Sequence, residues 1–236
     1  MIPVFAALAA TGPVLVELFT SEGCSSCPPA DTLLAELDRE QPVPGAEIVV
    51  LSEHVDYWNG LGWKDPFSAP QFSERQRGYE RRFQRDGVYT PQMVVDGRLQ
   101  GVGSDAGGAA AMIASAAGAP KADVRVAMED GRLRIDVGAL PQGGEAELSL
   151  AITEDGLQSA VQRGENRGRT LWHRGVVRRL SRVATVGAQG VSLTAPLRVD
   201  PRWKRGKLRA VAFVQRKDGG EVLGVGAMWL PKAPGR

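Results

Sequence analysis

The amino-acid sequence predicts an α/β domain of order βαβαββα over residues 14–118, followed by a separate all-β, sandwich-like domain over residues 121–236. Strand-like and helix-like segments alternate in the first half, whereas the second half shows no helical period of comparable strength. Gly118-Ala119-Pro120 is the expected linker between them. A chain of 236 residues can form two domains that each bury a core.

Four strands are expected in the first half. The apolar run from Val14 to Phe19, broken only by Glu17, predicts the first strand, and the run at 47–51 predicts the second. Residues 92–95 predict a third strand, and Asp96-Gly97 turns the chain into a short fourth.

Three helices are expected between and after these strands, at 28–39, 69–85 and 105–117. The first carries leucines on one face, and the second places aromatic residues at helical spacing. The third is rich in alanine, with Ser104 or Asp105 as its N-cap and Gly118 as its stop.

The second half reads as a series of short strands. Alternating apolar residues on both sides of Asp130-Gly131 predict a tight hairpin at 124–137. Further strands are expected at 148–152, 193–199, 208–213 and 222–228. Several short strands separated by turns favour a β-sandwich.

Composition excludes some classes of partner. The net charge is +2, which argues against a nucleic-acid-binding protein, and no stretch is long and apolar enough to span a membrane. The first ten residues resemble the end of a secretory signal, with a small-x-small site at Ala7-Leu8-Ala9. We therefore expect a periplasmic or secreted protein whose signal is truncated, although a frayed apolar tail and a cytoplasmic location remain alternatives.

The two cysteines form a single CxxC motif at Cys24-Ser25-Ser26-Cys27, placed between the first strand and the first helix. Amide groups at a helix N-terminus favour a sulfur anion, which is the attacking species in disulfide exchange. A redox pair is the main interpretation; an inert disulfide and part of a metal site are the others. Neither a metal nor a cofactor is required by the redox interpretation.

A second motif supports the redox interpretation. Thr90-Pro91 comes immediately before the third strand, and a proline there, in a chain with a preceding CxxC, suggests a cis peptide bond. Such a bend leaves the backbone of Thr90 free to pair with an extended peptide. An ordinary trans proline at the start of a strand is the alternative.

The segments that carry these motifs resemble known families. Residues 88–97 resemble the cis-proline segment of thioredoxins and glutaredoxins. The longer strings at 17–31, 54–58, 62–67 and 165–169, with His173, resemble the bacterial, mostly exported family called domain of unknown function 1223, which is thioredoxin-like in fold. The resemblance implies a thioredoxin-like first domain. It implies little about the substrate.

The resemblance also implies roles for individual residues. Cys24 would be the attacking thiol, Cys27 the resolving thiol, and Thr90 and Pro91 the cis-proline element. Glu17 lies near the position of the acid that thioredoxins bury under their site, where it would accept the proton of Cys27. An edge or rim position is the alternative for Glu17.

The expected function is therefore thiol–disulfide exchange with protein or small-molecule thiols and disulfides. The alternatives are a non-catalytic binding protein of the cell envelope with a structural disulfide, and a thiolate metal-binding protein. Trp58, Trp63 and His54 follow the second strand and are candidate substrate-binding residues, although tryptophans that fill a seam and a structural histidine would give the same pattern.

A polar bend in the second half, with Asn166, Arg169, Trp172 and His173, is the last candidate. It would either face the cysteine pair or form a buried hydrogen-bond cluster that fixes a loop.

Overall fold

A computed structural model describes residues 12–232 of the protein. The candidate signal cleavage site at residues 7–9 lies outside this range. The elements follow in the order β1 (Gly12–Thr20), α1 (Pro28–Glu40), β2 (Ala46–His54), α2 (Pro70–Arg82), β3 (Gln92–Val95), β4 (Leu99–Val102), α3 (Ala106–Ala117), β5 (Val124–Glu129), β6 (Arg132–Val137), β7 (Ala146–Glu154), β8 (Leu157–Ala160), β9 (Thr170–His173), β10 (Val176–Val186), β11 (Val191–Ala195), the 3-10 helix η1 (Arg205–Lys207), β12 (Leu208–Gln215) and β13 (Val222–Trp229).

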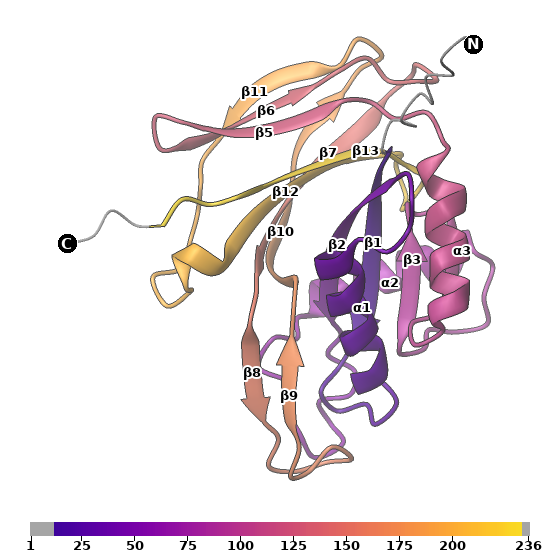
Figure 1. Ribbon diagram of the computed structural model, residues 1–236, viewed down its shortest axis with the longest axis vertical. Helices are drawn as coiled ribbons and strands as arrows, with labels where there is room; N and C mark the ends of the chain where they lie inside the picture. Colours follow the sequence, from indigo (N-terminus) through magenta and orange to yellow (C-terminus); the bar gives the residue numbers. More distant parts are fainter. Residues whose placement is uncertain (1–11, 233–236) are drawn as a thin grey trace, which may run out of the picture.

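The centre of the fold is one mixed sheet of eight strands, in the order β13-β12-β7-β10-β2-β1-β3-β4. Strands from both halves of the chain therefore belong to the same sheet (Figure 1). β2 joins β10 in parallel where Ser52 lies opposite Val176, and Ser52 N donates to Gly175 O at 2.8 Å.

This sheet corrects the fold class. The expectation of a βαβαββα thioredoxin-like domain followed by a separate all-β sandwich is wrong, because the strands of the second half extend the sheet of the first. Nothing in a local sequence period indicates that β10 pairs with β2. The domain boundary predicted between residues 118 and 121 stays a prediction.

Two layers cover one face of the sheet. α1 and α3 pack on β1, β2 and β3 through a core that includes Val16, Leu34 and Ile113. The three-stranded sheet β11-β6-β5 covers β7, β12 and β13 through a second core that includes Ile135 and Leu148. The predicted separate sandwich would have needed a second sheet of its own, whereas here the smaller sheet packs on the large mixed sheet.

α2 covers the opposite face of the large sheet. Phe72 of α2 packs with Leu15 and Val49 from the first half, and with Val211 and Phe213 from the second. One helix thus buries apolar side chains of both halves, which makes the sheet continuous in packing as well as in hydrogen bonding.

Buried ion pairs hold the second half against the first. Asp38 of α1 accepts hydrogen bonds from Arg174 and from Arg209, the latter at 2.7 Å. Asp96 pairs with Lys121, just beyond the expected linker, and also accepts from Leu15 N at 2.9 Å. Because each carboxylate is buried, removal of one of its cations would leave an unpaired charge inside the protein and destabilise the fold.

Most helices and strands lie where the sequence pattern puts them, but part of the second half does not. β8, β9 and the eleven-residue β10 were not expected, and the strand expected at 193–199 ends at Ala195. β10 is rich in arginine and only partly buried, so it lacks the apolar alternation of an ordinary strand. The β8–β9 hairpin extends alongside α1 (Figure 1).

Candidate functional site

The cysteine pair lies in the turn that leads from β1 into α1. Cys24 and Cys27 form a disulfide with a Cα–Cα distance of 5.4 Å, and Cys27 is the N-cap of α1. Both cysteines are fully buried, whereas Ser25 and Ser26 are exposed. Ser26 Oγ lies 3.4 Å from Cys24 Sγ, so a hydroxyl is within hydrogen-bond reach of the sulfur.

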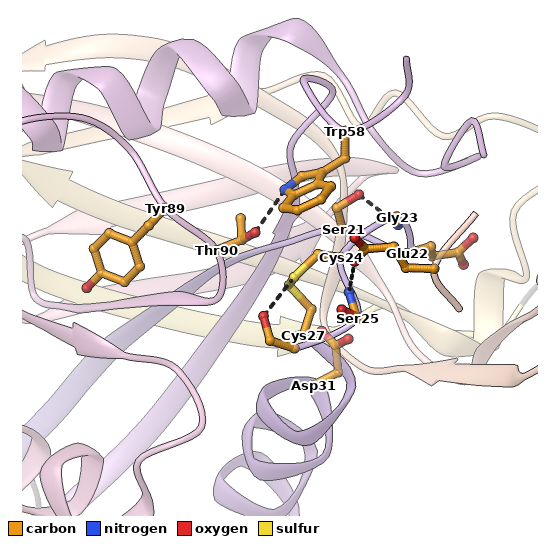
Figure 2. The surroundings of a disulfide bond; sticks show 12 residues. Ser21, Glu22, Gly23, Cys24, Ser25, Cys27, Asp31, Trp58, Tyr89 and Thr90 are labelled. Carbon is orange, nitrogen blue, oxygen red and sulfur yellow. Dashed lines mark hydrogen bonds between the residues drawn. A yellow bond between two sulfur atoms is a disulfide. The ribbon is translucent and has the colours of Figure 1, made fainter. Parts of the chain in front are cut away.

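The loop before β3 lies beside this turn. The Thr90–Pro91 peptide bond is cis. Trp58 Nε1 donates to Thr90 Oγ1 at 2.9 Å, and Figure 2 shows Trp58 and Thr90 on one side of the disulfide, with Asp31 on the other. Within residues 12–232, neither the N–H nor the C=O of Thr90 makes a hydrogen bond to another backbone group. This backbone edge is therefore free to pair with another chain.

Close packing fixes Pro91 against the start of α1. A Cβ atom added at Gly103 would lie 2.6 Å from Leu18 Cδ1, 3.1 Å from the Pro91 Cβ and 3.2 Å from the Ala30 Cβ. Ala30 is three residues after Cys27. Only glycine at position 103 leaves room for β1, the Pro91 loop and α1 to meet there.

Replacing Gly103 by alanine is expected to destabilise the protein by about 2 kcal/mol, because the added methyl group overpacks a site that has no spare volume. Gly107 is the matched control: it is exposed in α3, and its added Cβ would meet nothing closer than 3.7 Å. Gly107→Ala is expected to stabilise by about 0.5–1 kcal/mol through helix propensity. Urea unfolding measures the free energy of unfolding of both variants. Equal changes in the two would contradict the packing argument.

A buried acid lies one helical turn after Cys27. Asp31 is on the covered face of α1, and burial raises the pKa of its carboxyl to about 7, against the opposing effect of His173. Asp31 Oδ2 lies 4.0 Å from His173 Nδ1, and Asp31 Oδ1 has no hydrogen-bond partner in the described chain. A carboxyl group of this kind can exchange a proton near neutral pH.

Two histidine–carboxylate pairs surround Asp31. His173 Nε2 lies 3.0 Å from Glu22 Oε1, and His54 Nδ1 lies 2.7 Å from Asp65 Oδ2. The two imidazole rings meet edge to face at 4.7 Å. All four side chains are buried, and Asp65 Oδ2 also accepts from Glu22 N at 2.8 Å. His54 thus lies in a polar cluster behind the cysteine turn, not on a surface that could contact substrate directly.

The polar bend of the second half reaches the cysteine turn. Asn166 is fully buried, and its Nδ2 donates to Glu22 O and to Cys24 O, each at 2.9 Å. Glu165 Oε2 accepts a hydrogen bond from Ser25 N at 3.0 Å. Of the two interpretations of this bend, the one in which it faces the cysteine pair is confirmed for Asn166 and His173, and their buried hydrogen bonds also fix the loop. Trp172 is exposed.

The remaining predicted residues divide between two places. Trp63 Nε1 donates to Glu22 Oε2 at 2.7 Å, so Trp63 supports the same cluster. Glu17 lies elsewhere: its side chain points to the α2 face of the sheet, where it contacts Arg75 Nε and Tyr79 Oη, each at 2.5 Å. Alternation along β1 separates Glu17 from the face that α1 covers, so the acid beside the cysteines is Asp31 and not Glu17.

Sequence reasoning missed Asp31, Glu22, Asp65 and Glu165 as site residues. One signal was available for Asp31, which follows Cys27 by four positions and precedes Leu34 by three, so that it falls on the apolar face of the predicted helix. Loops bring the other three to the site, and no spacing in the sequence indicates that they lie there.

Comparison with known proteins places this architecture in a family. Residues 15–215 match the family model described as protein of unknown function (DUF1223). The chain belongs to this family. The segments that resembled it in the sequence, from the cysteine turn to the bend at 165–169, all lie within the match, whereas the thioredoxin-like assignment is not part of that result.

Two solved structures are similar to this fold. A crystal structure of protein AGR_C_4864 from Agrobacterium tumefaciens has 29% sequence identity and a TM-score of 0.78, and the match covers 98% of this chain and 99% of that one. HBP35 of Porphyromonas gingivalis has 14% identity and a TM-score of 0.66, with 98% and 80% covered, which indicates similarity of fold alone. No curated protein matches the chain.

None of the helices within residues 12–232 is long and apolar enough to cross a membrane. In the same range, no three His, Cys, Asp or Glu side chains are arranged to hold a metal ion.

Proposed function

We propose that this DUF1223 protein is a thiol–disulfide oxidoreductase that acts through Cys24 and Cys27. The observation that carries the proposal is the Cys24–Cys27 disulfide at the start of α1, next to a cis-proline loop with a free backbone edge. A bridge between residues three positions apart closes a very short loop and contributes little to stability. Its presence therefore favours a chemical role.

The reaction would proceed by two exchanges. The Cys24 thiolate attacks a substrate disulfide, whose bond breaks as a mixed disulfide forms and the first substrate thiol leaves. Cys27 then attacks Cys24, which releases the second thiol and restores the Cys24–Cys27 bond. The pKa of Asp31, raised by burial to about 7, suits this carboxyl to accept the Cys27 proton at neutral pH.

The substrates of this reaction would be protein or small-molecule disulfides. An extended peptide would pair with the free backbone of Thr90, close to Trp58. The proposal includes a distant relationship to thioredoxins and glutaredoxins, which the sequence of residues 88–97 resembles. It also includes a periplasmic or secreted location.

The proposal is tested with the full-length protein and its two cysteine variants. Reduced wild-type protein is expected to convert a model peptide disulfide to two thiols and to become oxidised itself. Cys27→Ser is expected to accumulate a mixed disulfide on Cys24, because the resolving thiol is missing, and Cys24→Ser is expected to lose the reaction. Mass spectrometry after rapid alkylation measures each species. A wild-type pair that never interconverts between dithiol and disulfide would refute the proposal.

One observation favours a second candidate, a binding protein with a permanent disulfide: both sulfurs are fully buried. The same redox experiment separates the two, because a permanent bridge resists a mild thiol reductant in the folded protein. The third interpretation, metal capture by the thiolates, has no comparable support from the described side chains.

A further inference from the structure

The start of α1 offers few amide groups to a sulfur anion. Pro28 and Pro29 occupy the first two helical positions and carry no N–H. The next two amides, of Ala30 and Asp31, both donate to Cys27 O, at 2.9 and 3.1 Å. The stabilisation that a helix N-terminus ordinarily gives to a thiolate is therefore reduced at this site.

A carboxylate from the second half also lies on the same turn. Glu165 Oε2 accepts from the N–H of Ser25, the residue next to Cys24, at 3.0 Å. Hydrogen bonding to Ser25, first by its side chain and then by its backbone N–H, lowers the pKa of Glu165, so the carboxylate is charged at neutral pH. No ion pair within residues 12–232 neutralises it, and the nearby Arg169 donates instead to Asn166 Oδ1 at 2.9 Å. Glu165 is exposed, so solvent screens its charge, but the hydrogen bond holds the carboxylate at the residue next to Cys24, where a negative charge opposes a second one on the sulfur.

We propose that Glu165 makes the Cys24–Cys27 pair a more reducing couple, by disfavouring the Cys24 thiolate. Dithiol pairs are strong oxidants when their reduced form is stabilised, so a pair without that stabilisation is driven toward the disulfide and reduces other molecules. The inference rests on the proposed function and adds its direction.

In this direction, electrons pass from the protein to its substrate. The reduced protein gives two electrons and two protons to a substrate disulfide, which leaves as two thiols, while the Cys24–Cys27 bond forms. An external thiol or dithiol reductant must then reduce this bond and become a disulfide itself. The second half of the chain would favour this direction, because it supplies the carboxylate.

The experiment equilibrates the whole protein with mixtures of reduced and oxidised glutathione, and alkylation followed by mass spectrometry measures the dithiol fraction. The wild-type protein is expected to be more reducing than glutathione. Glu165→Gln keeps an oxygen acceptor for Ser25 N–H but removes the charge, and is expected to shift the equilibrium toward the dithiol by about threefold, less in about 1 M salt. The thiolate absorbance of reduced Glu165→Gln should also appear at lower pH.

Glu36→Gln is the matched control. Glu36 is exposed on α1 and has no ion pair within the described chain, so its replacement removes one charge without touching the cysteine turn. Equal shifts in both variants, no shift in Glu165→Gln, or a wild-type couple more oxidising than glutathione would each overturn the inference and leave the exchange reaction standing. A pair that does not respond to glutathione in either direction would overturn the proposed function, and the inference with it.

Discussion

Replacing Arg75 by methionine is expected to destabilise the protein by about 3–5 kcal/mol near pH 7, because it leaves buried carboxylates without their cation. Arg75 Nε lies 2.5 Å from Glu17 and 3.4 Å from Glu53, and both acids are fully buried. Arg75 also donates to Tyr79 Oη and to Gln215 Oε1, each at 3.1 Å. Its guanidinium therefore joins α2 to strands of both halves.

The cost should depend on pH with a definite sign. Burial raises the pKa of Glu53 well above its ordinary value, and Arg75 opposes this effect. Without Arg75 the pKa of Glu53 rises further, so the folded variant holds protons that the unfolded chain releases, and its stability falls as pH increases above about 4.5. The loss relative to wild type should be smallest near pH 4.

Urea unfolding across this pH range measures the effect, and Arg77→Met is the control. Arg77 lies on the same helix, but its side chain is 48% exposed and pairs with Glu74 at 3.4 Å. Its replacement should cost less than about 0.5 kcal/mol at any pH. If the two variants lost the same stability, the buried cluster would not be the interaction that joins α2 to the sheet.

Replacing Asp31 by asparagine is expected to stabilise the oxidised protein at pH 8 while slowing its reaction. The pKa of Asp31 is about 7 in the fold and 3.8 for the ordinary group, so the fold binds the proton more tightly than the unfolded chain does. Stability is then lost as pH rises from about 4 to about 7, by roughly 4 kcal/mol in total. Asparagine cannot ionise, so the variant avoids this loss.

Chemical unfolding at pH 4 and pH 8 tests the stability, with Asp86→Asn as the control because Asp86 is exposed. Asp31→Asn should match wild type at pH 4 and exceed it at pH 8, whereas Asp86→Asn should differ little at either pH. In the same variant, resolution of the mixed disulfide by Cys27 should slow and lose its dependence on pH near 7. A variant that is no more stable at pH 8 would show that Asp31 is not held as a neutral acid.

The sequence by itself determined the local part of this protein. Turn residues and apolar periods located the three helices and the hairpin at Asp130-Gly131, because these features depend on neighbours a few positions apart. The CxxC motif, and a proline at the start of β3, likewise placed the two segments that meet at the disulfide. The family resemblance followed from the same segments.

The tertiary structure decided what no local period encodes. The pairing of β2 with β10 merges the two halves into one sheet, and it brings Glu165, Asn166 and His173 to a turn some 140 residues earlier. Which acid lies beside the cysteines was also decided there: Glu17 and Asp31 are both buried, but β1 turns Glu17 toward α2, whereas α1 turns Asp31 toward His173. Burial and long-range pairing set the charges of the site, because both depend on contacts between residues far apart in the chain.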